Sequence, residues 1–212
     1  ECVQPLIELF HDQPTMIGGR VIELANVWPD DAPIFIDAGL MLLRQMADVP
    51  VINAALAEYD RLTAVPVIRL SMIPQVIAAL LSSDAVQANG FAIRLQPEDF
   101  QDPPRLSQAV NGLINQAPVN FEEIDLIVDY QHVQAAGTYT QMIAANTTLV
   151  PNLNQWRSLT MLGGAFPQGI SHLPQATWQS LPRHEWVGFR QAHQNGQTGR
   201  ADCRYGDFLV RD

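Results

Sequence analysis

The sequence predicts an α/β protein, a parallel (β/α) barrel of the TIM-barrel type that we expect to be incomplete in this chain. Three observations predict it. Short apolar runs, each ending in a charged residue, recur along the 212 residues at intervals of about 30 residues, the length of one βα unit. Several intervening segments have apolar residues at helical spacing. The runs are apolar almost throughout, as in parallel strands that helices cover on both faces.

Five such runs are expected to be strands, because each has four or five residues of strand-forming type between turn residues. They occupy residues 5–8, 33–37, 66–69, 91–94 and 126–129. A sixth strand is expected at 158–162, where Gly163 and Gly164 end it, and a seventh at 208–210. An eight-stranded barrel needs more strands than these. We therefore expect one domain over residues 1–212, truncated at both ends.

Helical spacing predicts the segments between the strands. Apolar residues recur in this way at 51–62, from Pro74 to a stop at Asn89–Gly90, and at 106–114 after two prolines. Proline fits the first turn of a helix, and glycine fits the position just beyond its end. Trp186, Phe189 and Arg190 predict a short amphipathic helix, and residues 191–204 are expected to be a polar surface loop.

The alternative to a barrel is an open, doubly wound sheet. That fold usually carries a glycine-rich first turn, which this sequence lacks. A barrel also explains why charged residues end successive strands in one register. The barrel is therefore the preferred architecture.

Composition excludes several function classes. The chain has 22 acidic residues against 12 basic ones, and every basic residue is arginine. Without lysine there is no lysine Schiff base and no Walker A loop. A net charge of -10 makes direct nucleic-acid binding an unfavourable hypothesis, since phosphate neutralisation needs a basic surface. Cys2 and Cys203 form no metal-binding spacing, and no apolar run is long enough for a membrane span. We expect a cytoplasmic protein.

The charges at the strand ends predict one polar layer at the mouth of the barrel, where active sites of this fold lie. The layer contains Glu8, Asp37, Arg69, Arg94 and Asp129. In the functional interpretation, Arg69 and Arg94 bind an anion, while the three carboxylates act in acid–base catalysis or hold a cation such as Mg²⁺. The alternative is an internal network of salt bridges, because buried charges must pair whatever the function.

Other residues could extend this layer. His11 and His132 each follow a strand-end carboxylate by three residues, and His172 lies further along the chain. We include His132 as a candidate ligand contact, although a loop histidine is commonly just solvated. Phe166 is a second candidate contact, within the segment 163–167 that could present backbone N–H groups to an anion. A sharp turn after the sixth strand is the simpler interpretation of that segment.

A series of short motifs, in order along the chain, resembles the beta protein family, named after a T-even phage beta protein. The motifs lie at residues 5–8, 33–37, 66–69, 90–95, 125–129, 164–167, 183–186 and 205–208. The resemblance implies a barrel-like α/β protein of phages, mobile elements and bacterial genomes, sometimes encoded near defence genes. It also implies that sequence is missing at both ends. It implies no particular reaction.

Two functional hypotheses follow. The first is a hydrolase-like enzyme that acts on a phosphorylated or otherwise anionic small molecule. The second is a non-catalytic module that senses a ligand or binds a partner protein in a phage–host conflict system. In the second hypothesis, either the same pocket or the aromatic segment near the C-terminus would make the contact.

Overall fold

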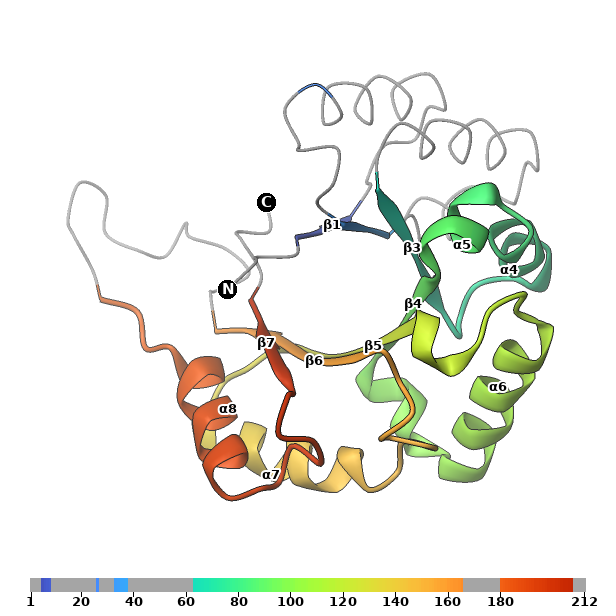
Figure 1. Ribbon diagram of the computed structural model, residues 1–212. Helices are drawn as coiled ribbons and strands as arrows, with labels where there is room; N and C mark the ends of the chain where they lie inside the picture. Colours follow the sequence, from blue (N-terminus) through green and yellow to red (C-terminus); the bar gives the residue numbers. More distant parts are fainter. Residues whose placement is uncertain (1–4, 9–25, 27–32, 38–62, 166–179, 208–212) are drawn as a thin grey trace. The chain divides into compact units, whose positions relative to one another are not determined.

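The computed structural model describes residues 5–8, 26, 33–37, 63–165 and 180–207. Within them, parallel strands alternate with helices (Figure 1), which confirms the predicted α/β class. The contacts group the chain into two compact units. The first unit comprises residues 1–94 and 112–125, and the second comprises residues 95–111 and 126–212. The expectation of a single domain over residues 1–212 stays a prediction.

The first unit contains four strands, which pair in sequence order and in parallel. They are β1 (Leu6–Glu8), β2 (Ile34–Asp37), β3 (Ala64–Arg69) and β4 (Phe91–Leu95, whose last residue belongs to the second unit). All four were predicted. Every residue of β2, β3 and β4 is buried, including Ile34, Ile68 and Ile93, which are wholly inaccessible. Burial of such a side chain contributes about 1.5–3 kcal/mol relative to exposure, so the continuous apolar runs are what hold this sheet.

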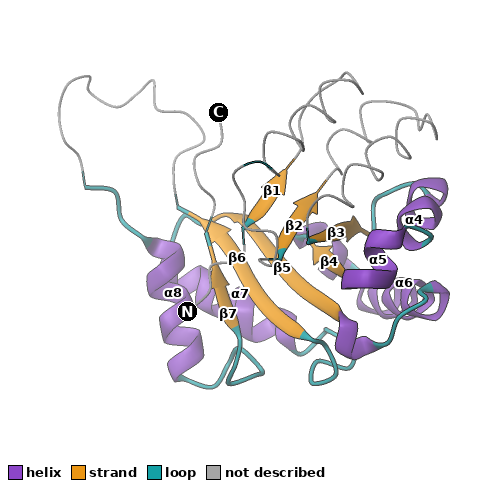
Figure 2. Ribbon diagram, turned by 45° about the horizontal axis from the view of Figure 1, so that its top comes forward, coloured by secondary structure: helices purple, strands orange, loops and turns teal. Residues whose placement is uncertain are grey.

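Helices α4 (Pro74–Leu81) and α5 (Asp84–Asn89) connect β3 to β4 (Figures 1 and 2). The sequence predicted one helix here, and the structure corrects that to two. The break falls at Ser82–Ser83, where the Ser83 hydroxyl accepts a hydrogen bond from the Val86 N–H and caps α5. A capping serine stabilises a new helix start. Gly90 then ends α5 with φ of 72°, a conformation that favours glycine.

Helix α6 (Pro103–Gln116) begins in the second unit and ends in the first, and β5 (Ile124–His132) begins in the first and continues in the second. Two short 3₁₀ turns lie beside them, η1 (Pro97–Gln101) and η2 (Phe121–Glu123). Both α6 and β5 were predicted. Each extends beyond its predicted bounds, because the apolar pattern marks the buried part of an element better than its ends.

The second unit contains α7 (Ala136–Thr147), β6 (Ser158–Gly164), α8 (His184–Gln194) and β7 (Arg204–Gly206). Strands β6 and β7 pair in parallel, and α8 packs against α7 and β6. The short amphipathic helix predicted around Trp186 is confirmed as α8. The sequence did not predict α7. Its buried residues, Tyr139, Ile143 and Thr147, lie at i, i+4 spacing among small residues, so its apolar stripe is narrow.

The region around residues 191–207 needs a correction. It was predicted to be a surface loop as far as 204, but α8 continues to Gln194 and a strand, β7, starts at Arg204. The strand predicted at 208–210 and the helix predicted at 51–62 lie outside the described residues. Among the helices of the described ranges, none has the length and apolarity that a membrane span requires.

Candidate functional site

Four of the five predicted strand-end charges lie in the first unit, and its strand register brings them together. In the strand register, Glu8 of β1 lies opposite Asp37 of β2, and Arg69 of β3 lies opposite Arg94 of β4. Between β2 and β3, Ile36 lies opposite Pro66, so Arg69 lies two residues beyond the position opposite Asp37. A shift by an even number of residues keeps side chains on one face of a sheet. All four charged side chains therefore project from the same face.

These four residues form one ion-pair network. The Arg69 Nε donates to both Asp37 oxygens, at 2.9 Å to Oδ2 and 3.2 Å to Oδ1, and its Nη2 donates to Glu8 Oε1 at 2.9 Å. The Arg94 Nη1 donates to the same Glu8 oxygen and, at 2.6 Å, to Asp37 Oδ2. Each arginine thus binds both carboxylates, and each carboxylate binds both arginines.

The network is buried, and the formal charges of its four described members sum to zero. The side chains of Asp37 and Arg94 are wholly inaccessible, while 4% of Arg69 and 9% of Glu8 is exposed. Buried charges are costly unless they pair and hydrogen-bond. Such pairing is expected both for an anion-binding site and for a salt-bridge network that only stabilises the fold. Chemically, the network offers rigid guanidinium N–H groups beside carboxylates at the carboxyl ends of parallel strands.

The fifth predicted residue, Asp129, belongs to the second unit. It is 1% exposed on β5, and its Oδ1 accepts a hydrogen bond from the Gln131 N–H at 2.7 Å. Gln131 has φ of 56°, in the left-handed region that non-glycine residues rarely adopt. This hydrogen bond fixes the Asp129 carboxylate three residues before the end of β5. That Asp129 joins the other four in one layer stays a prediction.

The remaining candidates have different outcomes. His132 is the exposed last residue of β5, which corrects its predicted place in the following loop. Gly163 and Gly164 are the last residues of β6, not a turn beyond it, and the Val133 N–H donates to the Gly164 carbonyl at 2.9 Å. Phe166, His11 and His172 lie outside the described residues. The described ranges contain no group of three or more His, Cys, Asp or Glu side chains that could hold a metal ion.

A second polar cluster, which the site prediction missed, joins the start of α8 to the end of β7. Arg183 donates through Nε to Glu185 Oε1, and through Nη2 to the Tyr205 hydroxyl at 3.0 Å and to Asp207 Oδ2 at 2.6 Å. The Tyr205 hydroxyl in turn donates to Glu185 Oε1 at 3.3 Å. Both segments appear among the motifs quoted above, at 183–186 and 205–208. Those motifs were therefore the available signal for this contact.

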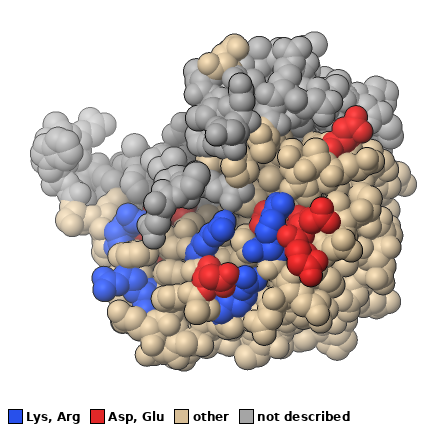
Figure 3. Space-filling model, in the orientation of Figure 1, with Lys and Arg blue, Asp and Glu red and all other residues tan. Residues whose placement is uncertain are grey.

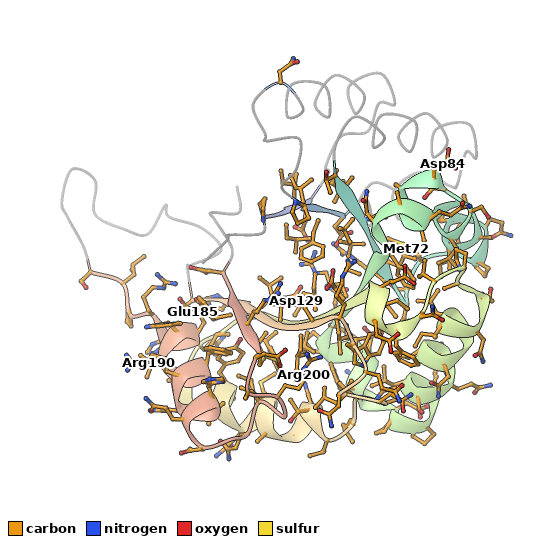
Figure 4. The ribbon with its side chains drawn as sticks, viewed as in Figure 1. Met72, Asp84, Asp129, Glu185, Arg190 and Arg200 are labelled. Carbon is orange, nitrogen blue, oxygen red and sulfur yellow. The ribbon has the colours of Figure 1, made fainter. Side chains whose placement is uncertain are left out.

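The cluster holds a carboxylate inside the second unit. Glu185 is 1% exposed and lies on α8 (Figure 4). Burial raises the pKa of the Tyr205 hydroxyl, so it stays protonated and able to donate, and the hydrogen bond to Glu185 raises the pKa of the Arg183 guanidinium. Glu185 Oε2 has no hydrogen-bond partner among the described residues. The desolvation of Glu185 is thus only partly compensated.

We expect Arg183→Met to destabilise the protein by about 2–3 kcal/mol, because Glu185 then keeps only a tyrosine donor for a buried charge. The double variant Arg183→Met/Glu185→Leu should recover most of that loss, since an apolar pair removes the desolvation cost as well. Urea unfolding of the three proteins measures both effects. Equal stability of the single variant and the unmodified protein would contradict the role given to Arg183.

Arginine and acidic side chains are interspersed on the face that Figure 3 shows. The described residues on this face display no continuous basic patch.

Comparison with known proteins identifies one similarity. A family model described as Beta protein matches the chain over residues 1–212. No curated protein and no solved structure matches this chain.

Proposed function

We propose that this chain, which belongs to the beta protein family over residues 1–212, is a (β/α)-barrel protein of the TIM-barrel type that binds a small phosphorylated or carboxylated molecule and acts on it as a hydrolase-like enzyme. Arg69 and Arg94 would bind the anionic group. Glu8, Asp37 and Asp129 would serve as acid–base groups.

One observation carries this proposal: two guanidiniums and two carboxylates meet at the carboxyl ends of four consecutive parallel strands. In parallel α/β folds this end of the sheet is where ligands bind and where catalytic residues lie. Guanidinium groups recognise phosphate and carboxylate oxygens through directed N–H donors. The inferred barrel agrees with strands that are buried on both faces and ordered along the sheet as in the sequence.

The test is calorimetric titration with inorganic phosphate and with acetate. We expect binding by the unmodified protein and at least a tenfold weaker affinity in Arg69→Gln. Arg69 is the more accessible of the two arginines, and loss of a charged donor typically changes a free energy by about 1.5–3 kcal/mol. Arg105→Gln is the matched control, because it removes the same charge from an exposed position. If none of the three proteins binds an anion, and circular dichroism verifies that all three are folded, the charged residues form only an internal network of salt bridges.

A non-catalytic interaction module is the second candidate, and the surface of α8 favours it. Trp186 and Val187 are 40% and 44% exposed, and the Arg190 guanidinium lies 5.8 Å from the Trp186 ring centroid. Exposed tryptophan and arginine side chains are frequent energetic centres of protein interfaces. Turnover assays with phosphate monoesters distinguish the candidates, because the enzyme hypothesis requires hydrolysis that Asp37→Asn abolishes.

A further inference from the structure

We propose that the Glu8 carboxylate occupies the place that an oxygen of the anionic ligand takes when the ligand binds. Binding would then be an exchange: the ligand displaces the Glu8 carboxylate from Arg69 and Arg94. This inference rests on the proposed anion-binding function. It adds that the Glu8 carboxylate occupies the binding position until the ligand displaces it.

The geometry around one oxygen atom carries the inference. Glu8 Oε1 accepts hydrogen bonds from Arg69 Nη2, at 2.9 Å, and from Arg94 Nη1. Two guanidinium groups that converge on a single anionic oxygen are an arrangement that suits phosphate and carboxylate ligands. Here a side chain of the protein itself supplies that oxygen.

Glu8 is better suited to leave than Asp37, the other carboxylate of the network. Both Asp37 oxygens accept from Arg69 Nε, and Asp37 is wholly inaccessible at the end of a fully buried strand. Glu8 has the largest exposed fraction in the network, 9%, and it ends a three-residue strand that is only half-buried. Its side chain is also one methylene longer, which gives it another rotatable bond. Asp37 therefore stays as the fixed partner that orients the guanidiniums.

The charge balance of the described residues favours the exchange. With two arginines and two carboxylates, the four described members of the network sum to a formal charge of zero. An anion that entered while Glu8 stayed in place would leave an uncompensated charge in a buried site, which is strongly unfavourable. A monoanionic group that replaces Glu8 preserves neutrality. The preferred ligand class is therefore a carboxylate or a singly charged phosphate.

Glu8→Gln tests the exchange. The amide keeps the size of the side chain and removes its charge, so the bound anion no longer competes with a carboxylate. We expect the affinity for inorganic phosphate, measured by calorimetry, to rise about tenfold or more. Glu8→Asp, which retains the charge on a shorter side chain, should show a smaller rise. Glu122→Gln is the control, because it makes the same charge change at an exposed position in the first unit.

The outcomes separate the two proposals. If the unmodified protein binds phosphate and Glu8→Gln binds it equally or more weakly, the exchange is wrong while the anion-binding function stands. If neither the unmodified protein nor any of the variants binds phosphate, both proposals fail. A rise shown equally by Glu122→Gln would indicate a general charge effect and would also overturn the exchange. Thermal unfolding of each variant without phosphate verifies that the compared proteins are folded.

Discussion

Arg94→Met is expected to destabilise the protein by about 3–5 kcal/mol, the loss typical of removing one partner from a buried ion-pair group. Arg94 is wholly inaccessible and donates to both Glu8 and Asp37. Without it, two buried carboxylates share one guanidinium, and the network carries a net negative charge. Because a domain of this size is typically stable by about 5–15 kcal/mol, the variant should unfold at a markedly lower urea concentration.

The matched control is Arg105→Met, which removes the same charge from an exposed position on α6. Its effect should stay within about 0.5 kcal/mol, as for most surface substitutions. Comparing the two urea midpoints isolates burial and pairing from the change in net charge. Similar midpoints for Arg94→Met and Arg105→Met would show that the ion-pair network does not hold the first unit together.

The sequence predicted strands β1 to β6 for a physical reason, whereas it missed β7 (Arg204–Gly206). A strand buried on both faces must be largely apolar, so the runs that end at Asp37, Arg69 and Arg94 stand out from their neighbours. Helix α7 escaped prediction because alanine, glycine and threonine fill most of it. Its close packing against α8 is a tertiary effect, and small residues at a helix contact leave no periodic apolar signal.

The candidate site was predictable in part. The positions of Glu8 and Asp37 at matching strand ends predict proximity, because the carboxyl ends of neighbouring parallel strands lie at one edge of a sheet. Two arginines share one Glu8 oxygen because Arg69 lies two residues beyond the position opposite Asp37. The apolar pattern of the sequence does not reveal this offset between β2 and β3. The contact between Arg183 and Tyr205 joins residues 22 positions apart, and only the presence of both segments among the motifs of the family resemblance pointed to it.

These two polar clusters stabilise the protein in different ways. In the first unit, the four described charges of the network sum to zero by formal count. In the second, Arg183 is largely exposed and holds a buried Glu185 whose second oxygen lacks a partner among the described residues. Substituting an arginine should therefore lower the free energy of unfolding more in the first cluster than in the second. The guanidiniums of the first cluster are buried, and charge interactions are stronger in a low-dielectric environment.

Gly188→Ala is expected to destabilise the protein by about 1–3 kcal/mol, the range for overpacking a filled core. In an unconstrained helix the same change stabilises, because alanine has the higher helix propensity by about 1 kcal/mol. Here a Cβ on Gly188 would lie 2.6 Å from the Ala136 carbonyl oxygen and 3.1 Å from the Tyr139 ring. The first of these atoms is backbone, so α7 and α8 would have to separate.

Gly112 and Gly137 provide the controls within the same chain. Both are helical, in α6 and α7, and a Cβ at either position would meet no atom within 4 Å. Their alanine variants should therefore raise the free energy of unfolding by about 0.5–1 kcal/mol, opposite in sign to Gly188→Ala. Urea unfolding of the three variants measures the contrast. Stabilisation by Gly188→Ala would mean that α7 and α8 do not approach as closely as the packing at this glycine requires, since only that contact separates the three substitutions.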